Sequence, residues 1–192
     1  MLLTGDGLLM DNDITSYLRE DPKNWWVDRM YLQEAWNSAR RSTDPSTQVG
    51  CSLVVPNGLG VVLCACNGVP HRLRQAGYPV IPQQKNYCTE HAEREILYSA
   101  LINGLPTENL TLYCTWATCA ECSRAIIRFG ISRVVTLTAL VNQTPDRWKD
   151  SIKNGLIMLR DSGIQVVGWR GDLGVDTPIT FDSKSVWNKD LL

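Results

Sequence analysis

His91-Ala92-Glu93 and Cys119-Ala120-Glu121-Cys122 are the two stretches that decide the fold, because each falls at the expected start of a helix. The apolar residues of 90–103 and of 119–129 predict these two helices, and the run from Leu110 to Cys114 predicts a strand between them. Strands that alternate with helices in this way are typical of a sheet covered by helices.

Further elements are predicted on both sides of this unit. They are helices from Trp25 to about Arg41 and over 146–162, and strands over 49–56, 60–66, 133–138 and 164–169. We therefore expect an α/β fold, a three-layer α/β/α sandwich around a central mixed five-stranded sheet. The expected remainder is an N-terminal extension over 1–24, a long loop over 67–88 in the domain of 25–170, and a polar, irregular tail over 171–192 that packs on the domain or on a neighbouring subunit.

Composition excludes several classes of protein. A net charge of −1 in 192 residues argues against a polynucleotide partner, which usually needs a basic face. The acidic start of the chain does not resemble a targeting peptide, and no apolar run reaches the roughly 20 residues of a membrane helix. We expect a cytoplasmic protein without a membrane partner, in which the seven cysteines stay reduced and serve as metal ligands or buried apolar residues.

One imidazole and two thiols are available for a metal at the two helix starts. Catalytic zinc commonly takes three protein ligands and leaves a fourth position for water, and His91, Cys119 and Cys122 would be those ligands. Helix N-termini favour the thiolate form that binds metal. Glu93, two residues beyond His91, can then move protons to and from the water.

Other interpretations of the cysteines stay open at this point. A structural zinc site would need a fourth ligand, for which Cys88 and Cys114 are the candidates. A redox pair at Cys119 and Cys122 would leave His91 without a role. The remaining cysteines are expected in the core of the domain: Cys51, Cys64 and Cys66.

These motifs make the chain similar to the deoxycytidylate deaminase group of the cytidine deaminase superfamily. The pattern His-x-Glu followed by Cys-x-x-Cys is the signature of zinc deaminases that act on nucleobases. Three further stretches, 42–50, 67–70 and 125–131, resemble segments of the same group, and the resemblance covers about residues 28–169. It implies a cytidine deaminase-like fold.

The resemblance also implies an activity and a set of roles. The reaction would be the hydrolytic removal of the 4-amino group of dCMP, with His91, Cys119 and Cys122 holding zinc and Glu93 carrying protons from the zinc-bound water to the base. Asn67 would hold the sugar hydroxyl, and the backbone at Ala92 would meet the base carbonyl. Relatives are homo-oligomers, with a hexamer favoured, and some are regulated by dCTP and dTTP.

Several residues depart from the family pattern or lie outside it. Thr118 replaces a proline before Cys119, and we expect its hydroxyl to cap the helix instead. Ala65-Cys66 replaces the Gly-Tyr that borders the allosteric site of the family. The candidates for substrate binding are Arg72 and Arg74 for the phosphate, with Lys85 behind them, and Trp116 for stacking on the base.

The sequence alone leaves other functions open. The substrate could be another base, a nucleoside or a 5-substituted dCMP. The chain could also be a catalytically silent, zinc-stabilised protein that binds nucleotides.

Overall fold

A computed structural model describes residues 13–56, 60–78 and 85–191 of the chain. Its central sheet has the strand order β2-β1-β3-β4-β5. The strands are β1 (Gly50–Val54), β2 (Val61–Cys66), β3 (Thr111–Cys114), β4 (Arg133–Leu137) and β5 (Gln165–Trp169). β1 runs antiparallel to both β2 and β3, whereas β3, β4 and β5 are parallel. The predicted mixed five-stranded sheet is therefore confirmed.

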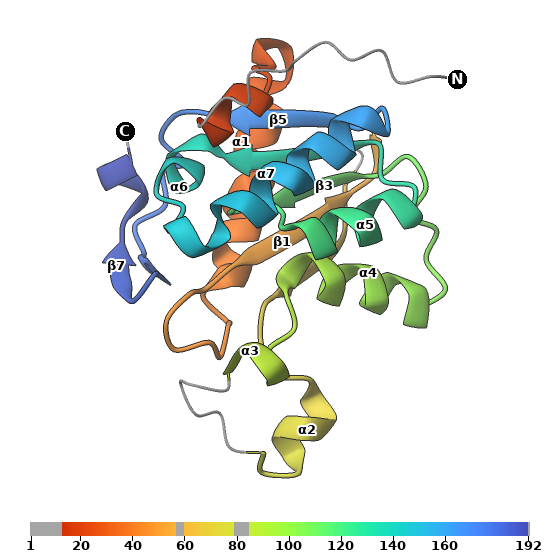
Figure 1. Ribbon diagram of the computed structural model, residues 1–192, viewed down its shortest axis with the longest axis vertical. Helices are drawn as coiled ribbons and strands as arrows, with labels where there is room; N and C mark the ends of the chain where they lie inside the picture. Colours follow the sequence, from red (N-terminus) through yellow and green to blue (C-terminus); the bar gives the residue numbers. More distant parts are fainter. Residues whose placement is uncertain (1–12, 57–59, 79–84, 192) are drawn as a thin grey trace.

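Helices cover both faces of this sheet (Figure 1). On one face lies α1 (Trp25–Ala39), and on the other lie α4 (Ala92–Ile102), α5 (Ala120–Arg128) and α7 (Asp146–Asp161). Successive side chains of β3 point to opposite faces of the sheet. Leu112 and Cys114 therefore pack with α4 and α5, whereas Tyr113 packs with α1. The three-layer α/β/α arrangement is thus confirmed.

The first helix approaches the sheet closely at a glycine. A Cβ atom at Gly50 would lie 2.0 Å from the carbonyl oxygen of Ala35, so only glycine allows α1 and β1 to meet there. Ala35 and Trp36 are fully buried in this contact. The apolar Met30 of the same helix is 47% exposed, so the buried stripe of α1 is narrower than its composition suggests.

Two segments that were expected to be irregular contain regular structure. The predicted loop over 67–88 includes α2 (His71–Gln75) and α3 (Lys85–Cys88), with 79–84 outside the described residues. The predicted irregular tail includes a hairpin of β6 (Ile179–Phe181) and β7 (Lys184–Val186) and a 3-10 helix (Asn188–Leu191). A short α6 (Thr138–Asn142) follows β4.

The hairpin could not be predicted from the sequence, for two reasons. Its strands are only three residues long, and its turn is made by Asp182 and Ser183 in the left-handed region, with φ of 48° and 65°, where a glycine would normally mark the turn.

The N-terminal extension is partly described. Two 3-10 helices (Ile14–Tyr17 and Pro22–Asn24) precede α1, and Arg19 forms a parallel bridge with Val167 of β5. Residues 1–12 lie outside the described part. The division into extension, domain and tail stays a prediction.

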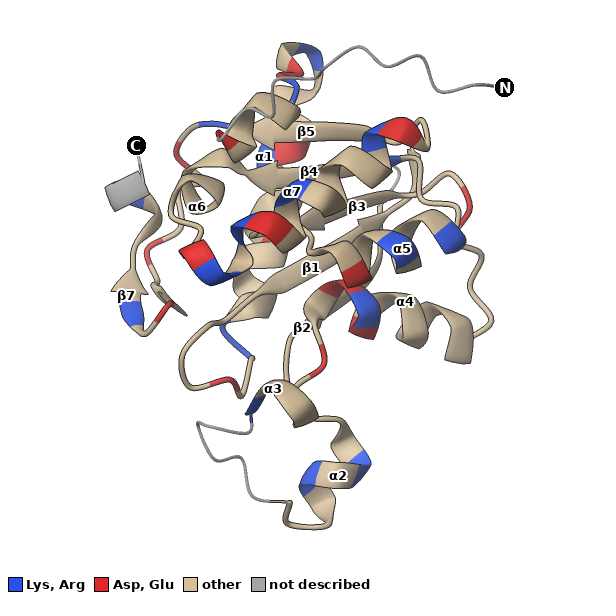
Figure 2. Cartoon of the chain, in the orientation of Figure 1, with Lys and Arg blue, Asp and Glu red and all other residues tan. Residues whose placement is uncertain are grey.

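Basic and acidic residues are interspersed along α5 and α7 (Figure 2). Within the described residues, no helix is both long and apolar enough to cross a membrane. Cys51 is fully buried as expected, but Cys64 and Cys66 are only half-buried, because β2 is an edge strand.

Candidate active site

A cavity opens at the edge of the sheet where β2, β3 and β4 end and β1 begins. Ligands of open α/β sheets usually bind outside the carboxyl ends of parallel strands, and β3 and β4 end here. The cavity is lined from the segments before β1, after β2 and after β3, from the starts of α4 and α7, and from the tip of the β6–β7 hairpin. Segments far apart in the sequence therefore meet at one place.

The three predicted metal ligands come together at its base. His91 and Cys119 are the residues that immediately precede α4 and α5, with extended backbones, and Cys122 lies in the first turn of α5. His91 Nδ1 lies 3.6 Å from Cys119 Sγ and 3.4 Å from Cys122 Sγ. All three ligand atoms lie within 4.8 Å of one another.

This spacing fits a tetrahedral zinc ion. Bonds of about 2.3 Å to sulfur and about 2.0–2.1 Å to nitrogen, at a tetrahedral angle, separate the two ligand atoms by about 3.6 Å. The two nitrogen–sulfur distances have this size. Within the described residues no fourth ligand joins the set: Cys114 groups with Cys51 and Glu93 instead, and the Cys88 thiol donates to the carbonyl oxygen of Lys85.

The protonation of the ligands also suits a metal. The pKa of Cys119 is lowered, chiefly by its hydrogen bond with Cys122 and further by His91, although burial opposes this shift. The same shared hydrogen bond and burial raise the pKa of Cys122. Burial lowers the pKa of His91, but the hydrogen bond with Cys119 and the negative charges of Glu93 and Cys119 together outweigh burial and leave the pKa raised. The lowered pKa of Cys119 favours the thiolate form that binds a metal.

The positively charged side chain of Arg94 lies beside the two cysteines. Arg94 of α4 donates to Cys122 Sγ at 3.7 Å and to Glu121 at 3.0 Å, and it also pairs with Glu90. A guanidinium stays charged throughout the accessible pH range, so it stabilises the negative charge of the thiolates.

Glu93 lies deep in the same cavity. Its side chain is almost fully buried, and this burial raises the pKa of the carboxyl. A carboxyl with a raised pKa can both accept and donate a proton near neutral pH, which is what a proton carrier needs. The buried thiols of Cys51 and Cys114 lie within 4.8 Å of it.

Thr118 does not behave as expected. Its hydroxyl forms a 2.8 Å hydrogen bond with the hydroxyl of Ser123, and the position before α5 is taken by Cys119, which makes no side-chain cap. The prediction that Thr118 caps α5 is therefore wrong. The reason is that Thr118 is fully buried, and its hydroxyl turns toward the nearest buried partner.

Three of the predicted substrate residues line the cavity: Asn67, Ala92 and Trp116. The Asn67 amide donates to the carbonyl of Thr47 and accepts from the N–H of Val49, so it also holds the segment before β1. The Trp116 indole N–H donates to Thr144.

The structure does not bring the two predicted phosphate residues to the cavity. Arg72 and Arg74 lie on α2, which projects from the body of the molecule beyond α3 (Figure 1). Arg74 lines a separate hollow next to β2.

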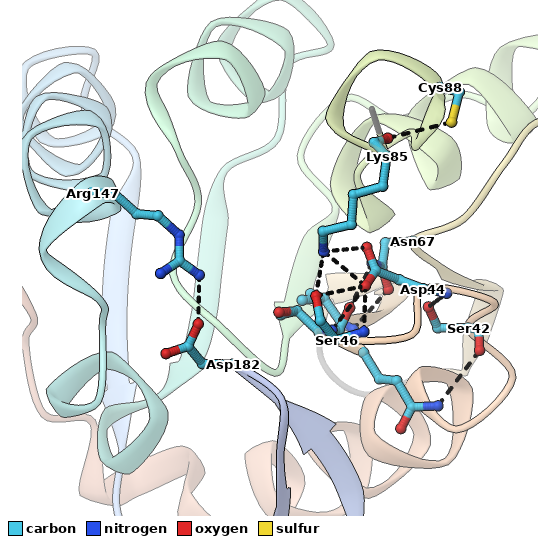
Figure 3. Close-up of polar contacts among 11 residues, drawn as sticks. Ser42, Asp44, Ser46, Asn67, Lys85, Cys88, Arg147 and Asp182 are labelled. Atoms are coloured by element: carbon cyan, nitrogen blue, oxygen red, sulfur yellow. Dashed lines mark hydrogen bonds and ion pairs between the residues drawn. The ribbon is translucent and has the colours of Figure 1, made fainter. Parts of the chain in front are cut away.

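Two other cations line the cavity, each beside a carboxylate. Lys85 Nζ lies 2.9 Å from both carboxylate oxygens of Asp44, and Arg147 pairs with Asp182 (Figure 3). Lys85 was predicted only to lie behind Arg72 and Arg74, and Arg147 was not predicted as a site residue. No local motif marks either residue, because their proximity depends on how α3, α7 and the hairpin pack.

Aromatic rings form part of the wall. The Trp148 ring lies 5.8 Å from that of His91 and 6.1 Å from that of Trp116, and Phe181 of the hairpin packs edge-on against Trp116 at 4.9 Å. Neither Trp148 nor Phe181 was predicted from the sequence to line the cavity. These rings pack edge-on against one another, and such an aromatic wall is suited to contact with a planar base.

Comparison with known proteins places this arrangement in a family. The cytidine and deoxycytidylate deaminase zinc-binding region matches residues 26–138, more than half of the chain. The chain belongs to that family. The match ends before α7, so the part of the cavity made by α7 and the hairpin lies outside the matched region of this deaminase-family protein.

Individual relatives agree with the family. A protein named "Probable deoxycytidylate deaminase" from Drosophila melanogaster is 30% identical over 64% of this chain and 64% of its own length. A deoxycytidylate deaminase of Mus musculus is 26% identical over 73% of this chain and 75% of its own length. The chain thus spans about two thirds to three quarters of these relatives.

A solved structure shows the same fold. The dCMP deaminase from the cyanophage S-TIM5 superposes with a TM-score of 0.56 and 19% identity, over 77% of this chain and 98% of that one. The cytidine deaminase-like fold expected from the sequence is therefore confirmed.

Proposed function

We propose that this protein hydrolyses dCMP to dUMP and ammonia with zinc as its cofactor. The observation that carries the proposal is the meeting of Glu93 with His91 and Cys119 in one cavity, where Cys122 completes the cluster of ligand atoms within 4.8 Å of one another. The names of the Drosophila and mouse relatives support dCMP as the substrate.

The cofactor supplies a nucleophile. His91, Cys119 and Cys122 would hold the zinc, which when bound would lower the pKa of a water molecule toward ~7 and so supply a nucleophile for C4 of the base at neutral pH. The choice of zinc rests on the donor set, since one imidazole and two thiolates at these distances suit its size and preference.

Glu93 carries the protons. Its carboxyl takes a proton from the attacking water and gives it to ring N3. It then takes the remaining proton from the new 4-hydroxyl and delivers it to the amine, so that the C–N bond breaks, ammonia leaves and the C4 carbonyl forms. The buried position of Glu93 supports this role, because its raised pKa brings the carboxyl nearer to the working pH.

The base and sugar are held by residues that line the same cavity. The base lies between Trp116 and the metal ligands, with its carbonyl toward the first N–H groups of α4 at Ala92, which have no partner within the helix. Asn67 binds the sugar hydroxyl. Its amide uses one N–H and one acceptor site in its two contacts with the backbone, so a second N–H and a second acceptor site remain for the substrate.

The phosphate binds to Arg147 rather than to Arg72 and Arg74. Arg147 lines the cavity and is 62% exposed in its side chain, so its guanidinium can turn toward a ligand. A guanidinium can bind phosphate through two parallel hydrogen bonds. Lys85 adds positive charge from the opposite wall (Figure 3).

Replacement of the proton carrier tests the proposal. Glu93→Gln keeps the shape of the side chain but cannot carry a proton, so we expect kcat for dCMP to fall by about 10²–10⁴-fold while zinc content stays stoichiometric. The assay is release of ammonia and dUMP, with metal content measured on the same samples.

The control is Glu95→Gln, which changes a carboxylate on the same helix outside the cavity lining and should leave kcat near wild type. Wild-type protein that holds zinc and dCMP but releases no ammonia would overturn the proposal and favour a silent nucleotide-binding protein. Deoxycytidine as a better substrate than dCMP would overturn the phosphate assignment alone.

A further inference from the structure

The tip of the β6–β7 hairpin is fixed against the segment that precedes β1. Gln48 and Thr180 exchange hydrogen bonds, because the Gln48 N–H donates to the Thr180 carbonyl and the Thr180 N–H donates to Gln48 Oε1, both at 2.7 Å. The N–H of Ser183 donates to the carbonyl of Ser46, also at 2.7 Å. These bonds hold the turn residues Asp182 and Ser183 at the cavity.

From this position the hairpin reaches two walls of the cavity. Phe181 is buried against Trp116, and the carboxylate of the next residue, Asp182, binds the guanidinium of Arg147 at 2.5 Å. Arg147 is the second residue of α7. The hairpin thus places a carboxylate on the cation that the proposed function assigns to the phosphate.

The ion pair on the opposite wall, between Lys85 and Asp44, is more buried and makes more hydrogen bonds. The Asp44 side chain is 4% exposed, and the same carboxylate oxygen that faces Lys85 also accepts from the N–H groups of Ser46 and Thr47. Lys85 donates to Ser46 Oγ as well. Separating this pair would leave a buried carboxylate without its cation, which is costly.

The pair of Arg147 and Asp182 is joined by one hydrogen bond, and its side chains are 62% and 39% exposed. Exposed ion pairs contribute little free energy, so this one opens readily. An incoming phosphate carries more charge than a carboxylate and offers more oxygens for the guanidinium fork. Arg147 can therefore exchange Asp182 for phosphate.

We infer that Asp182 is a specificity-determining residue: it occupies Arg147 in the substrate-free protein and must be displaced by the phosphate of the substrate. The inference rests on the proposed function for the role of Arg147. It means that binding of a nucleotide is weakened by the exchange, whereas binding of a nucleoside, which makes no contact with Arg147, is not. Asp182 acts through Arg147 and takes no part in the chemical step.

Substitution of Asp182 by asparagine tests the exchange. Asp182→Asn keeps the size of the side chain and removes its charge, so KM for dCMP should fall by roughly two- to fivefold with kcat unchanged, and KM for deoxycytidine should stay the same. The matched control is Asp176→Asn, which removes one negative charge from an exposed residue of the same segment outside the cavity lining. It should leave both KM values near wild type.

A double-mutant cycle assigns the effect to the pair. In the Arg147→Ala background, KM for dCMP should be raised, and the further change Asp182→Asn should have no effect on it. A KM for dCMP that rises or stays constant in Asp182→Asn, or that falls equally in Asp176→Asn, would overturn the inference.

Failure of the proposed function would look different from failure of this inference. If the wild-type protein does not deaminate dCMP, the proposed reaction fails, but the exchange can still be measured with inorganic phosphate by calorimetry. Phosphate should then bind Asp182→Asn more tightly than Asp176→Asn. Equal binding to these two variants would refute the role of Asp182 whatever the reaction.

Discussion

Asp44 illustrates how a single buried charge is stabilised in this fold. Burial would raise the pKa of its carboxyl, but the hydrogen bond from Lys85 and those from the N–H groups of Ser46 and Thr47 outweigh burial and leave the pKa lowered. The folded protein therefore binds a proton at Asp44 less readily than the unfolded chain does.

This shift predicts a contribution to acid sensitivity. Because the folded pKa lies below the unfolded value, the stabilisation is fully present at neutral pH, above the unfolded pKa of about 3.9, and is lost as the pH falls through the folded pKa. Asp44→Asn should lower the free energy of unfolding at about pH 7 and make it fall less between about pH 5 and pH 2 than in the wild type.

Chemical denaturation across that range measures both effects. The exposed carboxylate of Asp150 provides the control, since Asp150→Asn should give a profile parallel to wild type. An Asp44→Asn profile as steep as that of the wild type would contradict the assignment.

At the scale of elements, the contact between α5 and α7 positions the metal ligands. A Cβ atom at Gly155 of α7 would lie 2.6 Å from Ser123 Oγ, 2.8 Å from the carbonyl oxygen of Thr118 and 3.0 Å from the carbonyl carbon of Cys119. The glycine therefore lets α7 lie directly against the start of α5, where Cys119 and Cys122 are placed.

The change Gly155→Ala tests this packing. In an unconstrained helix alanine is more favourable than glycine by about 1 kcal/mol, but here the methyl group must displace the start of α5. We expect a loss of about 1–3 kcal/mol in the free energy of unfolding and zinc affinity weaker by about tenfold or more.

Denaturant unfolding and chelator competition are the two measurements. Asn154→Ala, at the exposed neighbouring position, is the control and should change zinc affinity little. A Gly155→Ala protein that is more stable than wild type would show that the two helices are not in the contact described.

At the scale of the whole molecule, the C-terminal hairpin is part of the core. Ile179, Phe181 and Val186 pack with residues of α1 and of the central strands on the face that α1 covers. The same hairpin supplies Phe181 and Asp182 to the cavity, so folding of the tail and completion of the site are linked.

Removal of the Phe181 ring should therefore affect stability and binding together. Phe181→Ala is expected to lower the free energy of unfolding by about 3–5 kcal/mol, because it leaves a cavity beside Trp116. KM for dCMP should rise, since the wall that fixes Trp116 is lost.

The control is Lys184→Ala, at an exposed position of the same hairpin, which should change the free energy of unfolding by no more than about 0.5 kcal/mol. Normal stability and KM in Phe181→Ala would mean that the tail is peripheral.

Patterns in the sequence were enough to predict the five strands of the central sheet, the helices α1, α4, α5 and α7, and the four residues His91, Glu93, Cys119 and Cys122 that the structure brings together. These features are local. The spacing of apolar residues predicts each helix or strand, and a motif of three or four residues at the start of a helix determines which side chains lie on the same side of that helix.

Which distant residues complete the cavity depends on tertiary packing and could not be predicted from local patterns. Arg72 and Arg74 follow Asn67 closely in the sequence, yet α2 carries them away from the cavity, whereas Arg147 and Asp182 meet there across a long stretch of chain. Likewise, Thr118 turns to Ser123 instead of capping α5. Such contacts depend on how helices and a short hairpin pack on the sheet, and that packing is the sum of many weak interactions along the whole chain, which no single segment encodes.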